Sequence, residues 1–420
     1  MRQVIVIGGG AAGLMAAGTA ATRGASVVLL EKKDRPGRKI SISGKGRCNV
    51  TSAMEPEEFM KHYPRNGKFL YSAFDQFSNR DMMEFVEAHG VPLKIERGQR
   101  VFPESDKAED IVDMLVKWCR RKGVRMECNA PVQRIERTKQ GRYTVVYEGG
   151  TLNGDAVILA TGGMSYPGTG STGDGYAFAE SLGHSITELR PGLIPLITEE
   201  SWVRELQGLS LKNVRLTAFQ DNKKKINEDF GEMLFTHFGI SGPIVLSMSR
   251  DIGEYMYKKK KPVKMKLDLK PALTEETLDA RLQRDFVKFA KKQFKNVLPE
   301  LLPSKLIPVF LKLCEIPEEK ECNAITKEER RHLVELLKNL TFTVIDCRPV
   351  KEAIVTCGGV KVKEIDPRTM ESKCSPGLYL AGEMIDVDGY TGGFNLQAAF
   401  STGRCAGNHA AVLPDAGQDG

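Results

Sequence analysis

The N-terminal segment, residues 1–31, carries two short apolar runs on either side of an alanine-rich stretch. Residues 4–7 are all apolar, as in a strand that is buried on both faces of a parallel sheet. Residues 11–23 are rich in alanine and predict a helix, and residues 25–30 predict a second buried strand, which ends at Glu31. This order of strand, helix and strand is typical of an α/β protein with a parallel sheet.

Further elements of the same kind follow along the chain. Short apolar runs at 156–159 and 378–380 predict two more buried strands, and small residues follow each of them. Residues 35–52 are rich in glycine and basic side chains, and they predict a loop. The other predictions are helices at 55–63, 79–89, 108–121 and 395–411 and strands at 124–128, 132–137 and 143–147.

The pattern changes near residue 190, where a long insertion is predicted to begin. Within it, segments 193–220, 261–269 and 340–345 predict β structure, whereas 274–296 and 326–339 predict helices. We therefore predict three parts: residues 1–191 and 351–420 form one α/β domain, and residues 192–350 form an inserted domain. The insertion is expected to be β-rich at 192–270 and 340–350 and helical at 271–339.

Length and composition fit a folded protein of two or three domains. The chain has 420 residues, of which 41% are hydrophobic and 27% charged. Since the apolar runs are short and interrupted, no membrane association is expected. The nine cysteines form no CxxC pair, which argues against a disulfide framework and a zinc ribbon, so no metal site is predicted. Scattered cysteines fit a reducing cytosol, and a cytoplasmic location is expected.

The positive charge is unevenly distributed. The formal net charge is +7, and residues 251–300 alone carry 13 Lys/Arg against 8 Asp/Glu. A solvated helical face with a lysine-rich turn explains this excess, and a surface for nucleic acid or anionic membrane is the alternative. That stretch lacks the interleaved aromatic residues that single-strand binding uses, so nucleic acid is not the expected partner.

The first predicted turn has the pattern of a dinucleotide-binding site. Residues 8–13 read Gly-Gly-Gly-Ala-Ala-Gly, follow a predicted strand and open a predicted helix, and an acidic residue, Glu31, follows the second strand. In such a unit Gly8 permits the tight turn, Gly10 lets the backbone approach a pyrophosphate, and Gly13 lets the helix pack closely on the strand. Free N–H groups at the helix N-terminus attract phosphates, and Glu31 accepts the ribose hydroxyls.

Two later segments favour FAD over NAD. Residues 154–162 and 377–383 each form a predicted strand that ends in small residues, which suits a sheet whose carboxyl edge follows a long cofactor. The predicted fold is therefore a Rossmann-type FAD-binding domain, glutathione-reductase-like, interrupted by the inserted β-rich and helical domain. Only one strand–GxGxxG–helix unit occurs, so there is no dedicated second nucleotide domain, and NAD(P)H would reach the flavin as a transient electron donor.

Four motifs resemble the BaiN-like family of NAD(P)/FAD-dependent oxidoreductases, whose members resemble bile-acid 4,6-reductases and aminoacetone oxidases. They are RKISISGKGRCN at 38–49, SYPGTGSTGDGY at 165–176, LFTHFGISGP at 234–243 and DVDGYTGGFNLQ at 386–397. The match runs from residue 3 to about residue 410. The resemblance implies that the 38–49 loop lies against FAD.

The residues of these segments suit that role. Two glycines of the 38–49 loop permit close backbone approach, and its basic residues supply charge for the diphosphate. The N-terminus of the 395–411 helix would stabilise negative charge on reduced flavin. The predicted cofactor-binding residues are Gly8, Gly10, Ala12, Gly13, Glu31, Lys32, Arg38, Lys39, Gly44, Gly46, Arg47, Cys48, Asn49, Val132, Thr161, Gly162, Gly382, Glu383, Asp386, Gly393, Asn395, Leu396 and Gln397.

The candidate catalytic groups are His237 and Tyr390. His237 could polarise a substrate carbonyl or return a proton, roles that histidine side chains commonly have, although a histidine flanked by aromatic residues also suits a structural role. Three functions remain open. A flavoenzyme could pass hydride from NAD(P)H to a small unsaturated carbonyl compound, or oxidise small amines or aminoketones with O2. The third is an RNA-associated flavoprotein, suggested by the lysine runs 223–225 and 258–261.

Overall fold

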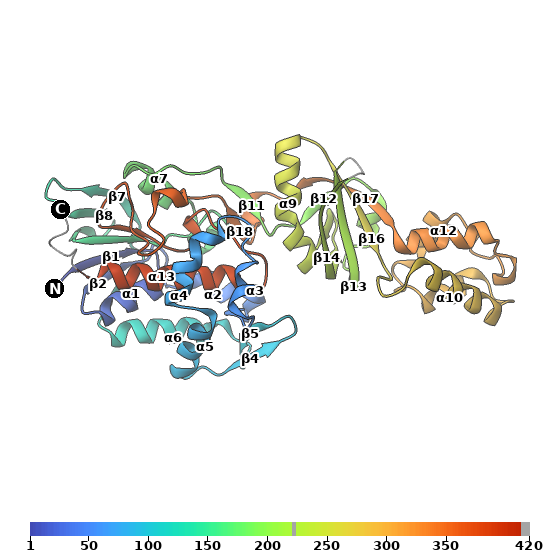
Figure 1. The fold of residues 1–420 in the computed structure, drawn as a ribbon, viewed down its shortest axis with the longest axis horizontal. Helices are drawn as coiled ribbons and strands as arrows, with labels where there is room; N and C mark the ends of the chain where they lie inside the picture. Colours follow the sequence, from blue (N-terminus) through green and yellow to red (C-terminus); the bar gives the residue numbers. More distant parts are fainter. Residues whose placement is uncertain (221–223, 413–420) are drawn as a thin grey trace. The chain divides into compact units, whose positions relative to one another are not determined.

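The computed structural model describes residues 1–220 and 224–412 (Figure 1). The chain divides into two compact units, one formed by Met1–Pro191 with Val350–Gly420 and the other by Gly192–Pro349. The first unit thus combines the two ends of the chain, and the second is an insertion between them.

The core of the first unit is a five-stranded sheet with the order β19-β10-β1-β2-β6, in which every neighbouring pair is parallel. Four of its strands carry mostly apolar residues because both faces of the sheet are buried there, whereas the edge strand β6 is largely polar. Since β1 lies between β2 and β10, the carboxyl edge at β1 is the switch point where α/β sheets bind ligands. The strands are β1 (Gln3–Ile7), β2 (Ser26–Leu30), β6 (Arg125–Glu127), β10 (Ala156–Leu159) and β19 (Leu378–Leu380).

Helices α1 (Ala11–Thr22) and α13 (Phe394–Ala410) pack backbone against backbone in this unit. A Cβ atom at Gly403 would lie 2.4 Å from the carbonyl oxygen of Ala12, and one at Gly407 would lie 2.4 Å from that of Ala16. Side chains larger than hydrogen would therefore push the two helices apart. On another side of α1, Gly18 makes room for the ring of Trp118 from α6 (Ala108–Arg121).

Two three-stranded antiparallel sheets and several short helices also belong to the first unit. The sheets are β7 (Val132–Arg137), β8 (Tyr143–Tyr147) and β9 (Gly150–Gly154), and β3 (Thr51–Ser52), β5 (Arg100–Pro103) and β4 (Leu93–Glu96). The short helices include α3 (Pro56–Met60), α4 (Tyr71–Gln76), α5 (Asn79–Ala88) and α7 (Asp174–Ser181).

The prediction of a loop throughout 35–52 is wrong in its middle. Residues Arg38–Ile42 form helix α2, and Ser43–Gly46 form a 3-10 turn. Helix α2 begins after Gly37, which has a φ of 76°, and it buries Ile40 in the core. Glycine and basic residues masked this single buried position in the sequence pattern.

The second unit is a closed six-stranded barrel with a helical extension (Figure 1). The barrel order is β12-β15-β14-β13-β16-β17, formed by β12 (Leu196–Thr198), β15 (Gly239–Ser241), β14 (Lys224–Phe235), β13 (Ser210–Gln220), β16 (Val263–Asp268) and β17 (Leu340–Cys347). Its α-helices are α8 (Ser201–Glu205), α9 (Pro243–Lys259), α10 (Glu275–Lys288), α11 (Ile307–Cys314) and α12 (Lys327–Lys338) among the described residues. The predicted fold class, a Rossmann-type domain interrupted by a β-rich and helical insertion, is confirmed. The predicted helix 274–296 is too long, because α10 ends at Lys288.

Candidate active site

A pocket opens at the carboxyl edge of the parallel sheet in the first unit. Residues that follow β1, β2, β10 and β19 line it, together with the first turns of α1 and α13. It contains about 1450 Å³ of empty space, including the open solvent at its mouth. Its lining runs from the ends of β1, β2 and β10 to the N-terminus of α13, which suits an extended ligand.

Three glycines of the first turn play different parts. Gly8 has a φ of 103°, and a Cβ atom there would lie 2.4 Å from the carbonyl oxygen of Ala160. A Cβ atom at Gly13 would lie 1.8 Å from the carbonyl oxygen of Gly8. Gly10 differs, because a Cβ atom there would have no described protein atom within 4 Å, and Gly10 lines the pocket. Gly8 and Gly13 therefore close the turn, whereas Gly10 leaves space for a ligand.

Glu31 fixes the same turn from the end of β2. Its Oε2 atom accepts a hydrogen bond of 2.8 Å from the N–H of Gly9, and its Oε1 atom accepts one of 2.8 Å from the N–H of Lys33. The residue is 8% exposed, and burial raises the pKa of its carboxyl group, although both backbone bonds oppose this. The remaining lone pairs of the carboxylate are free to accept hydroxyl groups.

The N-terminus of α13 forms another part of the pocket. Gly393, its cap, has a φ of 96°, and a Cβ atom there would lie 2.6 Å from the backbone of Thr51. Asn395 holds the preceding loop, because its Oδ1 accepts from the N–H of Gly389 and its Nδ2 donates to the carbonyl oxygens of Gly389 and Tyr390. Asn395 and Leu396 line the pocket. Within the described residues, neither α1 nor α13 has a side-chain cap, so both present free N–H groups.

One wall of the pocket is an ion pair with further hydrogen bonds. The Nζ of Lys39 lies 2.5 Å from Oε2 of Glu383 and 2.7 Å from Oγ of Ser165. The other carboxylate oxygen of Glu383 accepts hydrogen bonds from Ser165 and from the N–H of Thr356. This network joins α2 to the turn after β19.

A second ion pair lies near the end of β2. Lys32 contacts Asp174 at 2.8 Å, and both residues line the pocket together with Thr169, Gly170 and Ser171. No residue of the segment 169–174 is among the predicted cofactor-binding residues. Its glycines and its position in the 165–176 motif were the available signal. Arg38 also lines the pocket and pairs with the exposed Asp34 at 3.4 Å.

The structure brings together most of the predicted cofactor-binding residues. The pocket lining includes Gly8, Gly10, Ala12, Glu31, Lys32, Arg38, Lys39, Val132, Thr161, Gly162, Gly382, Glu383, Asn395 and Leu396. It does not include Gly13, Gly44, Gly46, Arg47, Cys48, Asn49, Asp386, Gly393 or Gln397 among the described residues. Several of these nine support residues that do line it.

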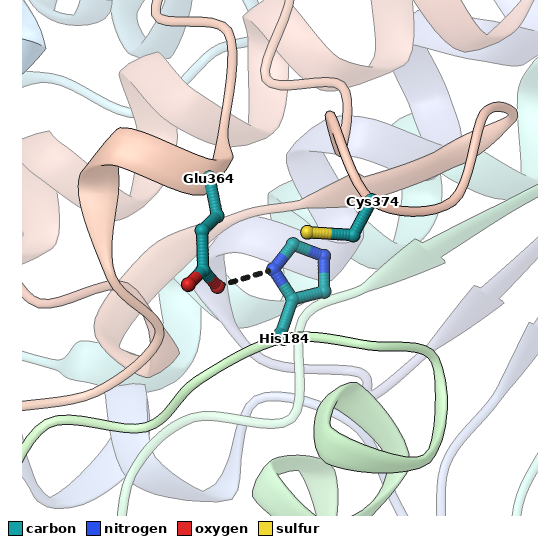
Figure 2. Close-up of side chains that lie close together, drawn as sticks. All are labelled: His184, Glu364 and Cys374. Atoms are coloured by element: carbon teal, nitrogen blue, oxygen red, sulfur yellow. Dashed lines mark hydrogen bonds and ion pairs between the residues drawn. The ribbon is translucent and has the colours of Figure 1, made fainter.

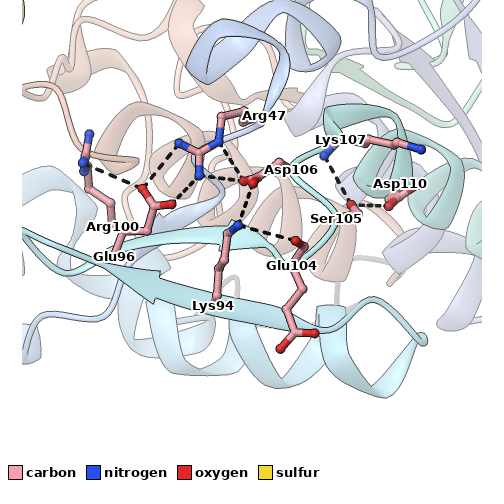
Figure 3. A network of polar contacts seen from close by, with 9 residues as sticks. All are labelled: Arg47, Lys94, Glu96, Arg100, Glu104, Ser105, Asp106, Lys107 and Asp110. Atoms are coloured by element: carbon pink, nitrogen blue, oxygen red, sulfur yellow. Dashed lines mark hydrogen bonds and ion pairs between the residues drawn. The ribbon is translucent and has the colours of Figure 1, made fainter.

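Arg47 belongs to a network of charged residues next to β4 and β5 (Figure 3). Its guanidinium group pairs with Glu96, donates a 2.7 Å hydrogen bond from Nε to Asp106, and stacks 4.2 Å from the centre of the Phe102 ring. Asp106 also pairs with Lys94. Arg47 is not among the residues that line the pocket, and two carboxylates compensate its charge, so its contact with a diphosphate stays a prediction.

Five other predicted residues of this loop and of the last helix lie outside the pocket lining: Gly44, Gly46, Cys48, Asn49 and Gln397. Gly44 and Gly46 adopt left-handed conformations with φ of 56° and 82°. Cys48 is fully buried, and burial raises the pKa of its thiol to about 12. The Oδ1 atom of Asn49 is buried without a hydrogen-bond partner among the described atoms. Gln397 donates to the carbonyl oxygen of Phe77 and to Ser401.

Asp386 and Tyr390 lie in the loop before α13. Asp386 is 2% exposed and pairs with Arg65 at 3.0 Å. Burial raises the pKa of its carboxyl group, and the charge of Arg65 opposes this rise. Tyr390 donates its N–H to the carbonyl oxygen of His62, and the two rings meet edge to face.

His237 belongs to the second unit. It is exposed in the turn between β14 and β15, and its ring lies edge to face with Phe238, 4.9 Å between centres. Its proposed role in catalysis therefore stays a prediction.

A cluster of possible metal ligands lies outside the pocket lining (Figure 2). The Nδ1 of His184 lies 3.3 Å from Glu364, and its Nε2 lies 2.7 Å from Oγ of Ser372. Cys374 is the third member of the group. Protein atoms already contact both ring nitrogens. His184 therefore links the segment after α7 to the 364–374 segment through hydrogen bonds of its buried ring.

The pocket fits a dinucleotide on three observations. Gly10 leaves open space at a helix N-terminus, two uncapped helix N-termini line one cavity, and Glu31 offers a buried carboxylate. Anionic phosphates bind at such N-termini because of the free N–H groups and the helix dipole.

No helix within 1–220 and 224–412 has the length and apolar character needed to cross a membrane.

Comparisons with known proteins agree with the fold. The model of the HI0933-like protein Rossmann domain family matches residues 2–409. The chain is 32% identical to a 3-dehydro-bile acid delta(4,6)-reductase of Clostridium scindens, over 99% of this chain and 100% of that protein. It is 33% identical to a ribosomal RNA dihydrouridine synthase of Escherichia coli, over 95% of this chain and 96% of that protein.

A solved structure with a similar fold is 3-ketosteroid-delta4-(5alpha)-dehydrogenase from Rhodococcus jostii. It has a TM-score of 0.54 at 14% identity and covers 98% of this chain and 97% of the other. The 3-ketosteroid delta1-dehydrogenase of Sterolibacterium denitrificans has a TM-score of 0.53 at 14% identity, over 98% and 100% of the two chains. The chain therefore belongs to the HI0933-like Rossmann family, and it is an oxidoreductase with a Rossmann-type FAD-binding domain.

Proposed function

We propose that this protein is a flavin-dependent reductase of carbon–carbon double bonds that are conjugated to a carbonyl group. The observation that carries the proposal is the chemistry shared by its full-length relatives. A 3-dehydro-bile acid delta(4,6)-reductase and a ribosomal RNA dihydrouridine synthase both match this chain over nearly the whole length of both proteins. A 3-oxo steroid with such double bonds and the uracil ring both contain a double bond conjugated to a carbonyl, and reduction adds one hydride and one proton.

The pocket residues are assigned to FAD as follows. The N-terminus of α1 at Gly10 and Ala12 would hold the pyrophosphate, with Arg38 as an additional cation. Glu31 would accept the ribose hydroxyls of the adenosine. Asn395 and Leu396, at the N-terminus of α13, would face the flavin and stabilise negative charge. When bound, FAD supplies the capacity to accept a hydride from a reduced nicotinamide and deliver it to the substrate.

The protein must also supply the proton and a polarising group for the carbonyl. Tyr390 is the candidate within the first unit, because its loop is attached to α13 by Asn395. His237 is the candidate from the second unit. A positioned general acid contributes about 10²–10⁴-fold to a rate. If Tyr390 donates the proton, Tyr390→Phe should lower kcat by that factor; if His237 donates it, His237→Gln should do so. In either case, the rate of flavin reduction by the nicotinamide should stay unchanged.

Anaerobic stopped-flow absorbance tests the reductase. The flavin-loaded protein is mixed with NADH or with NADPH, and the bleached flavin is then mixed with a 3-oxo-Δ4,6 steroid or with uridine-containing RNA. We expect bleaching by at least one nicotinamide and recovery of the absorbance by at least one acceptor. Absence of bleaching by either nicotinamide over minutes would contradict the proposal. Hydrogen peroxide release with small amines and O2 would instead support an oxidase.

A further inference from the structure

We propose that the outer face of the barrel in the second unit binds single-stranded RNA. This inference rests on the proposed function for RNA as a substrate, and it adds the surface that would hold the polynucleotide. We name this surface the basic–aromatic face. It is formed by outward-facing residues of three strands: Arg215 and Phe219 of β13, Phe230 of β14, and Lys264 and Lys266 of β16.

Strand register creates this face from residues that are distant in sequence. In the strand register, Arg215 of β13 lies directly opposite Phe230 of β14, and Phe219 of β13 lies directly opposite Lys264 of β16. Directly paired residues point to the same side of a sheet, and residues two apart along a strand do so as well. Arg215, Phe219, Phe230, Lys264 and Lys266 therefore share one side, while their strand neighbours Leu216, Met265 and Leu267 are buried in the barrel.

The chemistry of the face alternates cations with aromatic rings. Phe230 is 49% exposed, and Lys266 lies 5.4 Å from the centre of the half-buried Phe219 ring. Arg215 and Lys264 are exposed, and within 1–220 and 224–412 neither has an ion-pair partner. Two acidic residues beside the face pair with cations: Asp268 pairs with Lys338 at 2.7 Å, and Glu228 pairs with Lys225 at 3.6 Å. A third, the exposed Glu232, accepts a hydrogen bond of 2.8 Å from Ser210.

The described residues of the two lysine runs lie near one end of this face. β14 starts at Lys224, opposite Gln220, and β16 starts at Val263, directly after the run 258–261. Since Phe219 pairs with Lys264, the end of β13 lies beside the beginning of β16. Lys224, Lys259 and Lys264 are exposed. Lys223 lies outside the described residues.

RNA fits this face better than a membrane does. A multistranded sheet face with two exposed rings among cations can stack bases and hold phosphates, as sheet-based RNA-binding modules do. Interfacial binding to lipid would require a continuous apolar surface, whereas charged residues separate the two rings here. The linear sequence concealed this arrangement, because the aromatic residues and the lysines come from different strands.

Fluorescence anisotropy with a labelled, uridine-containing single-stranded RNA tests the inference on the full, flavin-loaded protein. Binding should weaken steeply between about 50 and 200 mM salt, since phosphate contacts release counterions. Phe230→Ala should weaken binding about fivefold or more, the loss expected for one stacked base. Lys264→Ala with Lys266→Ala should reduce the salt slope by about 0.7 for each phosphate contact removed.

A matched double variant controls for charge. Arg284→Ala with Lys291→Ala removes two exposed cations from α10 and the segment after it, and it should leave binding within about twofold. Unchanged melting temperature and flavin absorbance verify folding of each variant. Nicotinamide bleaching of the flavin is measured separately, so a failed reductase is distinguishable from a failed RNA surface.

The outcomes decide the inference. Selective loss in the variants of the basic–aromatic face supports it. It is overturned if the wild-type protein does not bind the RNA, if both variants of the basic–aromatic face bind as the wild type does, or if the control loses as much affinity. Binding of the wild type to phosphatidylglycerol vesicles but not to RNA would also overturn it.

Discussion

Lys39 and Glu383 are 344 positions apart in the chain, yet their Nζ and Oε2 atoms lie 2.5 Å apart in the wall of the pocket. Glu383 also accepts hydrogen bonds from Ser165 and Thr356. The pair therefore ties α2 to the turn after β19, and it places one neutralised carboxylate beside the proposed cofactor.

Removal of Lys39 should weaken cofactor binding. In Lys39→Gln, Glu383 keeps a negative charge without its cation, which would repel phosphate and loosen the wall. We expect the Kd for FAD to rise about tenfold, equivalent to about 1.4 kcal/mol. The double variant Lys39→Gln with Glu383→Gln should recover part of this loss. Quenching of FAD fluorescence measures both values, and equal losses in the single and double variants would contradict the ion-pair explanation.

Gly10 and Gly13 should respond differently to alanine. Gly13→Ala places a Cβ atom 1.8 Å from the carbonyl oxygen of Gly8, so it should cost about 3 kcal/mol or more of unfolding free energy. Gly10→Ala meets open space and should change apoprotein stability by less than about 1 kcal/mol, while it lowers FAD affinity. Urea unfolding and FAD titration separate the two effects. A stable Gly10→Ala protein with wild-type FAD affinity would show that the pyrophosphate lies elsewhere.

Arg38 and Arg47 should also differ. Arg38 lines the pocket, and Arg38→Ala should raise the Kd for FAD about tenfold through loss of a charged phosphate contact. Arg47 lies in the network of Figure 3, where exposed pairs each contribute about 0.2–1 kcal/mol. Arg47→Ala should lower stability by that order and leave FAD affinity within twofold. The reverse ranking of the two Kd values would restore Arg47 as a phosphate ligand.

The pair of Arg65 and Asp386 should be important for stability. Asp386 is 2% exposed, so Arg65→Ala leaves a buried carboxylate without its cation and should cost about 3–5 kcal/mol. Asp386→Asn combined with Arg65→Ala should cost less, because no charge remains buried. Chemical unfolding at neutral pH compares these variants. A single variant with the same stability as the double variant would mean that Asp386 becomes protonated or solvated instead.

His184 should make stability depend on pH. Burial lowers the pKa of His184 below 6.5, although Glu364 opposes this shift. The unfolded chain then binds a proton more readily than the folded protein, so stability is fully present above pH 6.5 and declines as the pH falls towards the folded pKa. His184→Gln should be less stable at pH 8 but lose this part of the slope. His332→Gln, at an exposed position of α12, serves as the control. An unchanged dependence of stability on pH in His184→Gln would contradict the role assigned to His184.

The site could be predicted from the sequence where local chain geometry determines it. Gly8, Gly10 and Gly13 have roles that follow from a tight turn between a strand and a helix, and fourteen of the predicted cofactor-binding residues line the pocket. The segment 169–174 was missed because its contacts depend on how the chain returns to the sheet edge after β10. The ion pairs of Arg47 could not be predicted, because a basic residue in a glycine-rich loop does not reveal which carboxylates lie near it.

The sequence by itself determined the β–α–β unit, the insertion and the class of cofactor, because periodicity and glycine spacing encode backbone conformation over short distances. Tertiary structure decided which charges are neutralised and which remain available. Lys39 and Glu383 meet only because α2 and β19 reach the same edge, and Phe219, Phe230 and Lys264 share a face only because of strand register. Such contacts depend on pairing between distant segments, and no single stretch of sequence specifies them.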